Sequence, residues 1–372
     1  MATNCITQSY IELVNAIVNL SDAYLYAARL DDALQLLSSE LVELLECEFP
    51  LEERVRIQVQ RANIMRFKNR LDGSSNDATL GLLFEAEKTA KSLDDRGLLA
   101  DVASLIGLIL YDQELWASTL ETPLQYFEQA LAIRRETDDQ KGIVESLFNI
   151  GTVHQNKKGR ADEDIERALA YFEEAYQLAE EGGFRWEKAH VARHLGYIYG
   201  HQKGDLSTAL SYHKEFLDVN EEVGFKLYLP PAHTRVGFTY YELEDLDRAL
   251  EHFEAAQAIA EETGYQHPLA EAWLGLGLVQ EGKGDASAAL KYYERALAIA
   301  QPINLLGLSA WTKTARIARI SMSTDCGNRY HSKNLPNSGV TPRIICTSIA
   351  DTTLARRAVN STIATATVLG TI

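Results

Sequence analysis

One segment near the end of the chain, residues 273–296, reads WLGLGLVQEGKGDASAALKYYERA. Ala289 lies 12 residues after Gly277, Tyr293 follows four residues later, and Ala296 follows three residues after that. Small residues let two helix backbones approach closely, and an aromatic ring fills the groove between them. The segment therefore predicts two packed helices joined by the turn that contains Gly282 and Gly284.

The same pattern recurs along most of the chain. Gly237 is followed at the same offsets by Ala249, Phe253 and Ala256. Successive glycines of this kind are spaced by 44, 45, 41 and 40 residues, and they are Gly107, Gly151, Gly196, Gly237 and Gly277. Repeats of this length are typical of arrays of helix pairs.

Glycine and proline mark the expected helix ends. Gly183, Gly224 and Gly264 each precede an aromatic residue, an arrangement typical of a left-handed cap at a helix C-terminus. Prolines fall in expected connections or first helical turns, where a missing N–H costs little. These prolines are Pro50, Pro123, Pro230, Pro231, Pro268 and Pro302. Both residue types agree with the repeat pattern.

The repeats resemble the tetratricopeptide repeat, whose pattern W-x2-L-G-x2-Y is followed by A-x3-F. The matching residues are Trp273, Leu276, Gly277, Ala289 and Tyr293. The resemblance implies an all-α fold, a right-handed superhelical solenoid of antiparallel helix hairpins with one concave face. About seven hairpins are expected over residues 1–318, with the strongest matches at 189–301. The period is longer than the basic one of about 34 residues and resembles that of bacterial regulators and scaffold proteins.

The resemblance also implies that the first helix of each hairpin lines a binding groove. Residues three before and one, four and five after the small residue are expected to face it. The expected partner-binding residues are His190, Arg193, Tyr197, His201, Thr234, Arg235, Phe238 and Tyr241. Aromatic and arginine side chains suit a peptide or an acidic ligand. The alternative is that the aromatic residues pack one hairpin on the next.

No catalytic or cofactor-binding constellation stands out in the sequence. His190 and His194 have no third ligand at the spacing of a metal site, and the four cysteines are widely scattered. The Lys and Asn pair with which some members of the family clamp a chaperone C-terminus is also absent from the corresponding positions. We therefore predict no enzyme activity, no cofactor and no metal.

Charge and hydropathy restrict the partners. The 372 residues include 36 Lys and Arg against 53 Asp and Glu, a formal charge of −17, which predicts no binding to nucleic acid. No apolar run reaches the roughly 20 residues that cross a bilayer, so no membrane insertion is expected. The first residues lack the features of a secretory signal, which predicts a cytoplasmic location.

The composition changes abruptly at residues 319–372, which contain six Lys and Arg, two Asp and no Glu. We predict an irregular tail there. Two interpretations are open: a disordered extension, as chain ends often are, or the product of a shifted reading frame or misplaced gene end.

Together these features favour a non-enzymatic scaffold that binds a protein or peptide partner in the groove of an all-α solenoid. The alternative function is a sensor or regulatory subunit of a bacterial signal-transduction or transcription-control system. The sequence indicates neither the partner nor the oligomeric state.

Overall fold

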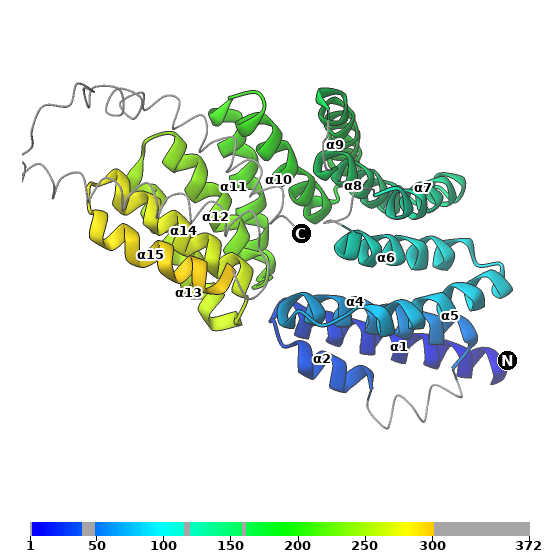
Figure 1. Ribbon diagram of the computed structural model, residues 1–372. Coiled ribbons are helices and arrows are strands. Elements are labelled where there is room, and N and C mark those ends of the chain that lie inside the picture. The colour runs from blue at the N-terminus through cyan, green and yellow to red at the C-terminus, as the bar shows by residue number, and fades with distance from the viewer. Residues whose placement is uncertain (1, 39–48, 115–119, 158–160, 301–372) are drawn as a thin grey trace, which may run out of the picture. The chain divides into compact units, whose positions relative to one another are not determined.

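The computed structural model describes residues 2–38, 49–114, 120–157 and 161–300, and in these ranges every regular element is a helix (Figure 1). The first four hairpins are α1 (Ala2–Tyr26) with α2 (Leu30–Leu37), α4 (Leu51–Asp72) with α5 (Asp77–Leu93), α6 (Arg96–Glu114) with α7 (Glu121–Glu136), and α8 (Gln140–Asn156) with α9 (Asp162–Gly182). The next three are α10 (Arg185–His201) with α11 (Leu206–Val223), α12 (Leu229–Glu242) with α13 (Leu246–Thr263), and α14 (Gln266–Gly282) with α15 (Ala286–Ala300). The predicted all-α array of antiparallel helix hairpins is confirmed for these residues.

The chain divides into two compact units. The first comprises residues 1–232 with 262–265, and the second comprises residues 233–261 with 266 onward. The predicted boundary between solenoid and tail, at residues 318 and 319, lies outside the described residues and stays a prediction.

The repeated glycines lie where the sequence pattern placed a close approach of two helices. A Cβ atom added to Gly151 in α8 would lie 2.7 Å from the ring of Phe172 in α9. A Cβ atom on Gly277 in α14 would lie 2.3 Å from the ring of Tyr293 in α15. Real Cβ atoms do not approach a ring so closely, so each aromatic ring occupies the space that the missing side chain leaves. Phe172 is fully buried as a result.

Glycine also ends helices as predicted. Gly183 follows α9 with φ 67°, in the left-handed region that favours glycine. Its amide donates to the carbonyl of Glu180, and the amide of Phe184 donates to the carbonyl of Ala179. This pair of hydrogen bonds satisfies two carbonyls that the end of a helix leaves open.

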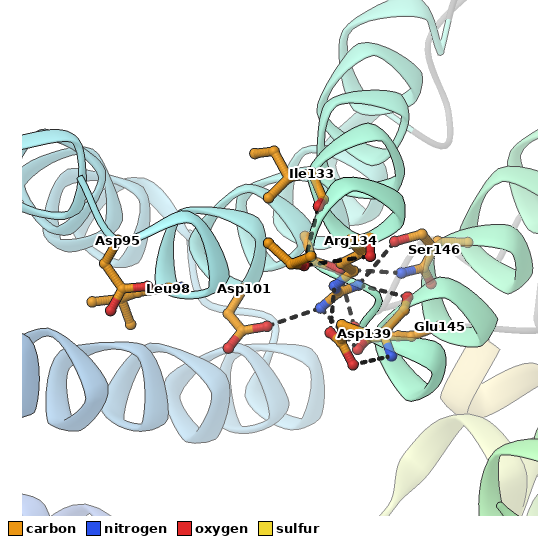
Figure 2. Close-up of polar contacts among 12 residues, drawn as sticks. Asp95, Leu98, Asp101, Ile133, Arg134, Asp139, Glu145 and Ser146 are labelled. Carbon is orange, nitrogen blue, oxygen red and sulfur yellow. Dashed lines mark hydrogen bonds and ion pairs between the residues drawn. The ribbon is translucent and has the colours of Figure 1, made fainter. Parts of the chain in front are cut away.

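A buried arginine joins α7 to the flanking first helices α6 and α8 (Figure 2). The Nη1 atom of Arg134 donates to the carbonyl of Gly142 at 3.1 Å and to Oγ of Ser146 at 2.9 Å. Its Nη2 atom lies 2.9 Å from Oδ1 of Asp101 and 3.2 Å from Oε2 of Glu145. Arg134 is 2% exposed, whereas the two carboxylates are about half exposed. One guanidinium thus fixes the positions of three consecutive helices.

Candidate functional site

The predicted groove residue His190 lies in α10 within an aromatic cluster of the first unit. Its ring centroid is 4.0 Å from that of Trp186, 4.6 Å from that of Tyr228 and 5.2 Å from that of Phe216. The Nε2 atom is buried and has no hydrogen-bond partner in the structure. Burial, together with the positive charge of Arg193, holds the pKa of His190 well below its usual range. His190 is therefore a neutral, packed ring at pH 7.

This environment predicts how stability depends on pH. The fold favours neutral His190, so the stability it contributes is complete above its unfolded pKa of about 6.5 and is lost as pH falls toward its depressed folded pKa. Between pH 6.5 and 5.5, this residue should lower the free energy of unfolding by up to about 1.4 kcal/mol. Urea unfolding of wild type and His190→Gln at both values measures the effect. The variant should show the shallower pH dependence, and parallel slopes would contradict the prediction.

Arg193, one turn further along α10, is also buried. Its Nη2 atom donates to Nε2 of His194 at 2.8 Å, which places the His194 proton on Nδ1. That nitrogen then donates to Oε1 of Gln155 in α8 at 2.5 Å. The Arg193 guanidinium also lies 5.4 Å from the centroid of the Phe216 ring, within the range of a cation–π contact. These contacts hold Arg193 in a defined position between α8 and α11.

The last two predicted residues of α10 lie side by side at its end. The ring centroids of Tyr197 and His201 are 4.7 Å apart. Tyr197 is buried and His201 is half-buried. With His190 and Arg193, all four residues predicted on α10 belong to the first unit.

The four residues predicted on α12 belong to the second unit. Nη2 of Arg235 lies 3.3 Å from Oε1 of Glu271 in α14, and both side chains are buried. The rings of Phe238 and Phe253 meet edge-on with centroids 4.9 Å apart. Thr234 is fully buried and Tyr241 is half-buried. Arg235 and Phe238 therefore make the packing contacts that the sequence left open as an alternative.

The structure brings a second polar group together on the first helices α4, α6, α8 and α10. We call Arg70, Tyr111, Asp112, Asn156 and Arg193 the inner polar cluster. Nδ2 of Asn156 donates to the hydroxyl of Tyr111 at 2.6 Å. Burial raises the pKa of Tyr111, while the hydrogen bond from Asn156 and the charges of Arg193 and Arg70 oppose the shift. Tyr111 is therefore a neutral hydroxyl between two cations.

The inner polar cluster carries a net positive charge in a chain with formal charge −17. Its one carboxylate, Asp112, already pairs with Arg66 of α4, at 2.6 Å and 3.2 Å. Nη2 of Arg70 donates to the hydroxyl of Tyr265 at 3.3 Å. Oδ1 of Asn156 is buried without a hydrogen-bond partner in the structure. A buried acceptor without a donor costs free energy, so the amide oxygen favours a ligand that brings an N–H group.

The predicted offsets locate two of these residues. Asn156 lies five residues after Gly151, which is one of the positions expected to face the groove. The same rule applied to Gly107 gives Tyr111 and Asp112, four and five residues later, although the prediction covered only the central repeats. Arg70 has no comparable signal, because α4 contains no glycine of the repeat.

An open cleft of about 630 Å³ lies elsewhere in the first unit, between the end of α9 and helices α10 and α11. Its basic residues have acidic partners: Arg185 pairs with Glu222, and Lys188 pairs with Glu180 and Glu215. This cleft therefore offers less charge to an anionic ligand than the inner polar cluster does.

Within the part of the chain that the structure describes, no group of three or more His, Cys, Asp or Glu side chains could hold a metal ion. None of the described helices has the length and apolar character needed to cross a membrane.

Comparison with known proteins identifies the repeats. A family model described as "Tetratricopeptide repeat" matches residues 228–301. Among solved structures, a Rap protein complexed with Competence and Sporulation Factor is 17% identical with a TM-score of 0.53, over 80% of this chain and 79% of that one. BtubC from P. vanneervenii is 19% identical with a TM-score of 0.49, over 60% of this chain and 91% of that one. Aspartyl phosphate phosphatase F from Bacillus subtilis is 14% identical with a TM-score of 0.49, over 88% and 97%. A search of curated proteins finds no match.

Proposed function

The chain is a tetratricopeptide-repeat protein, and from this premise we propose that it is a non-enzymatic scaffold that binds a segment of a partner protein. The proposed binding surface is formed by the first helices of the hairpins in the first unit. Its centre is the inner polar cluster, flanked by the predicted residues His190, Tyr197 and His201. The predicted residues of α12, which are Thr234, Arg235, Phe238 and Tyr241, remain proposed contacts of the second unit.

The observation that carries this proposal is the chemistry of the inner polar cluster. Guanidinium groups form strong, directional hydrogen bonds with carboxylates, and Arg70 and Arg193 both act on Tyr111. The unsatisfied Oδ1 of Asn156 complements the backbone N–H of an extended segment. The cluster therefore suits a partner segment that carries an acidic side chain.

A sensor or regulatory subunit is the second candidate. The Rap protein with a similar fold is described in complex with Competence and Sporulation Factor, so a helical array of this kind accommodates a regulatory ligand in that protein. A scaffold and a sensor share the same binding surface. They differ in whether binding changes the conformation of the array.

Selection from a library of random ten-residue peptides tests the binding surface and does not require the partner to be identified. We expect wild-type protein to enrich peptides rich in Asp and Glu. The neutral double variant Arg70→Gln/Arg193→Gln should bind the selected peptides at least about 30-fold more weakly, since each lost charge-assisted hydrogen bond contributes about 1.5–3 kcal/mol.

The matched control is Arg185→Gln, which removes an exposed arginine that lines the open cleft. It should bind the selected peptides as wild type does. Circular dichroism and thermal melts show whether each variant is folded. Equal binding by folded double variant and wild type would contradict the proposal, as would enrichment of basic peptides.

A further inference from the structure

The N-terminal hairpins contact a connection about 200 residues later in the chain. Phe225 and Leu227, between α11 and α12, belong to one hydrophobic core with residues of α1, α2 and α4, and each is 2% exposed. The ring centroid of Phe225 lies 4.8 Å from that of Tyr26 and 6.3 Å from that of Phe67. We call this the N-terminal contact.

Two hydrogen bonds accompany the rings. The amide of Lys226 donates to the carbonyl of Tyr26 at 2.9 Å, and Nη2 of Arg70 donates to the hydroxyl of Tyr265 at 3.3 Å. In a repeat array each hairpin is stabilised by its sequence neighbours. The N-terminal contact joins hairpins that are not neighbours in sequence, so the packing within each hairpin does not depend on it.

The N-terminal contact also covers part of the proposed binding surface. The ring of Tyr228 lies 6.5 Å from that of Phe67 on one side and 4.6 Å from that of His190 on the other. It leaves Nε1 of Trp186 and Nε2 of His190 buried without hydrogen-bond partners in the structure. Opening the contact would hydrate both atoms, which offsets part of the free energy lost when the rings separate.

We propose that the N-terminal contact is a latch, which opens and closes as a unit while the repeats stay folded and which regulates access to the inner polar cluster. A contact with few buried rings opens locally at a smaller free energy than global unfolding. The latch itself follows from the contacts of the free protein. Its control of access rests on the proposed function.

Hydrogen exchange of the full chain, read by mass spectrometry, tests the latch without a ligand. We expect the amides of residues 225–228 to exchange at least about 100-fold faster than those in the middle of α8. Phe225→Ala should accelerate exchange by about tenfold more in residues 225–228 and at the end of α1, with α8 unchanged. Val223→Ala, which alters an exposed side chain two residues away, is the control and should leave all three segments unchanged.

Equal exchange rates in wild type for residues 225–228 and α8 would overturn the latch, because the contact would then open only when the whole unit unfolds. Equal acceleration of α8 by Phe225→Ala would overturn it for the same reason.

A disulfide tests the control of access. Tyr26 and Lys226 are joined by a backbone hydrogen bond, so cysteines at these positions are close enough to pair. In Tyr26→Cys/Lys226→Cys, with the four native cysteines replaced by serine, oxidation should weaken binding of the library-selected peptides about tenfold, and reduction should restore it. Undiminished binding by the oxidised protein would overturn regulation by the latch. Failure of wild type to select any peptide would count against the proposed function, whereas the exchange experiment would still decide the latch.

Discussion

Phe172→Ala is expected to lower the free energy of unfolding of the first unit by about 3–5 kcal/mol. Phe172 is fully buried, and its ring lies in the space that Gly151 leaves open on the neighbouring helix. Removing the ring leaves a cavity between two helix backbones that the repeat holds close together. The helices cannot collapse into this cavity without disturbing the hairpins on either side, so the loss should lie at the upper end of the range.

Urea unfolding followed by circular dichroism measures this effect. Phe84→Ala is the matched control, because the Phe84 side chain in α5 is 44% exposed. The control should lower the free energy of unfolding by less than about 1 kcal/mol. Similar losses for the two variants would show that the contact between aromatic ring and glycine does not organise the hairpin.

Arg134→Met is expected to lower the free energy of unfolding by about 2–3 kcal/mol at pH 7. The substitution removes the donors to Gly142 and Ser146 and leaves Asp101 and Glu145 facing one another without a cation. The loss should shrink at pH 4, where the two carboxylates begin to take up protons and their mutual repulsion weakens.

The neighbouring arginine provides the control for this prediction. Arg135 is 55% exposed and makes a surface ion pair with Glu174. Arg135→Met should cost less than about 1 kcal/mol, because exposed ion pairs contribute little. Equal effects at positions 134 and 135, or an effect of Arg134→Met that grows toward pH 4, would contradict the role assigned to the buried guanidinium.

The repeat pattern predicted the hairpins because each one uses the same local device. Gly151 with Phe172 and Gly277 with Tyr293 are separated by fixed distances in sequence, and both pairs meet across one hairpin. A short-range contact that recurs leaves a period, and a period can be read from a single sequence. The glycine after α9 was predictable for the same reason, since a left-handed helix cap depends on its immediate neighbours.

The binding surface was less predictable, because its contacts join different hairpins. Tyr111 and Asn156 obey the offset rule, but Arg70 lies in a repeat that lacks the guiding glycine. The N-terminal contact between Tyr26 and Phe225 leaves no periodic signal at all, since it occurs once and spans about 200 residues. The residues predicted on α12 have the expected chemistry, yet Arg235 is committed to an ion pair with Glu271.

Site-specific photo-cross-linking in the source cells tests most directly whether a partner binds on the first helices. A photoreactive phenylalanine analogue replaces His201, the half-buried residue at the end of α10, and in a second variant it replaces Lys214, which lines the open cleft of α11. We predict a protein adduct from position 201 that disappears in the Arg70→Gln/Arg193→Gln background, with no such adduct from position 214. An adduct from position 214 alone, or one from position 201 that persists in the double variant, would contradict binding at the inner polar cluster.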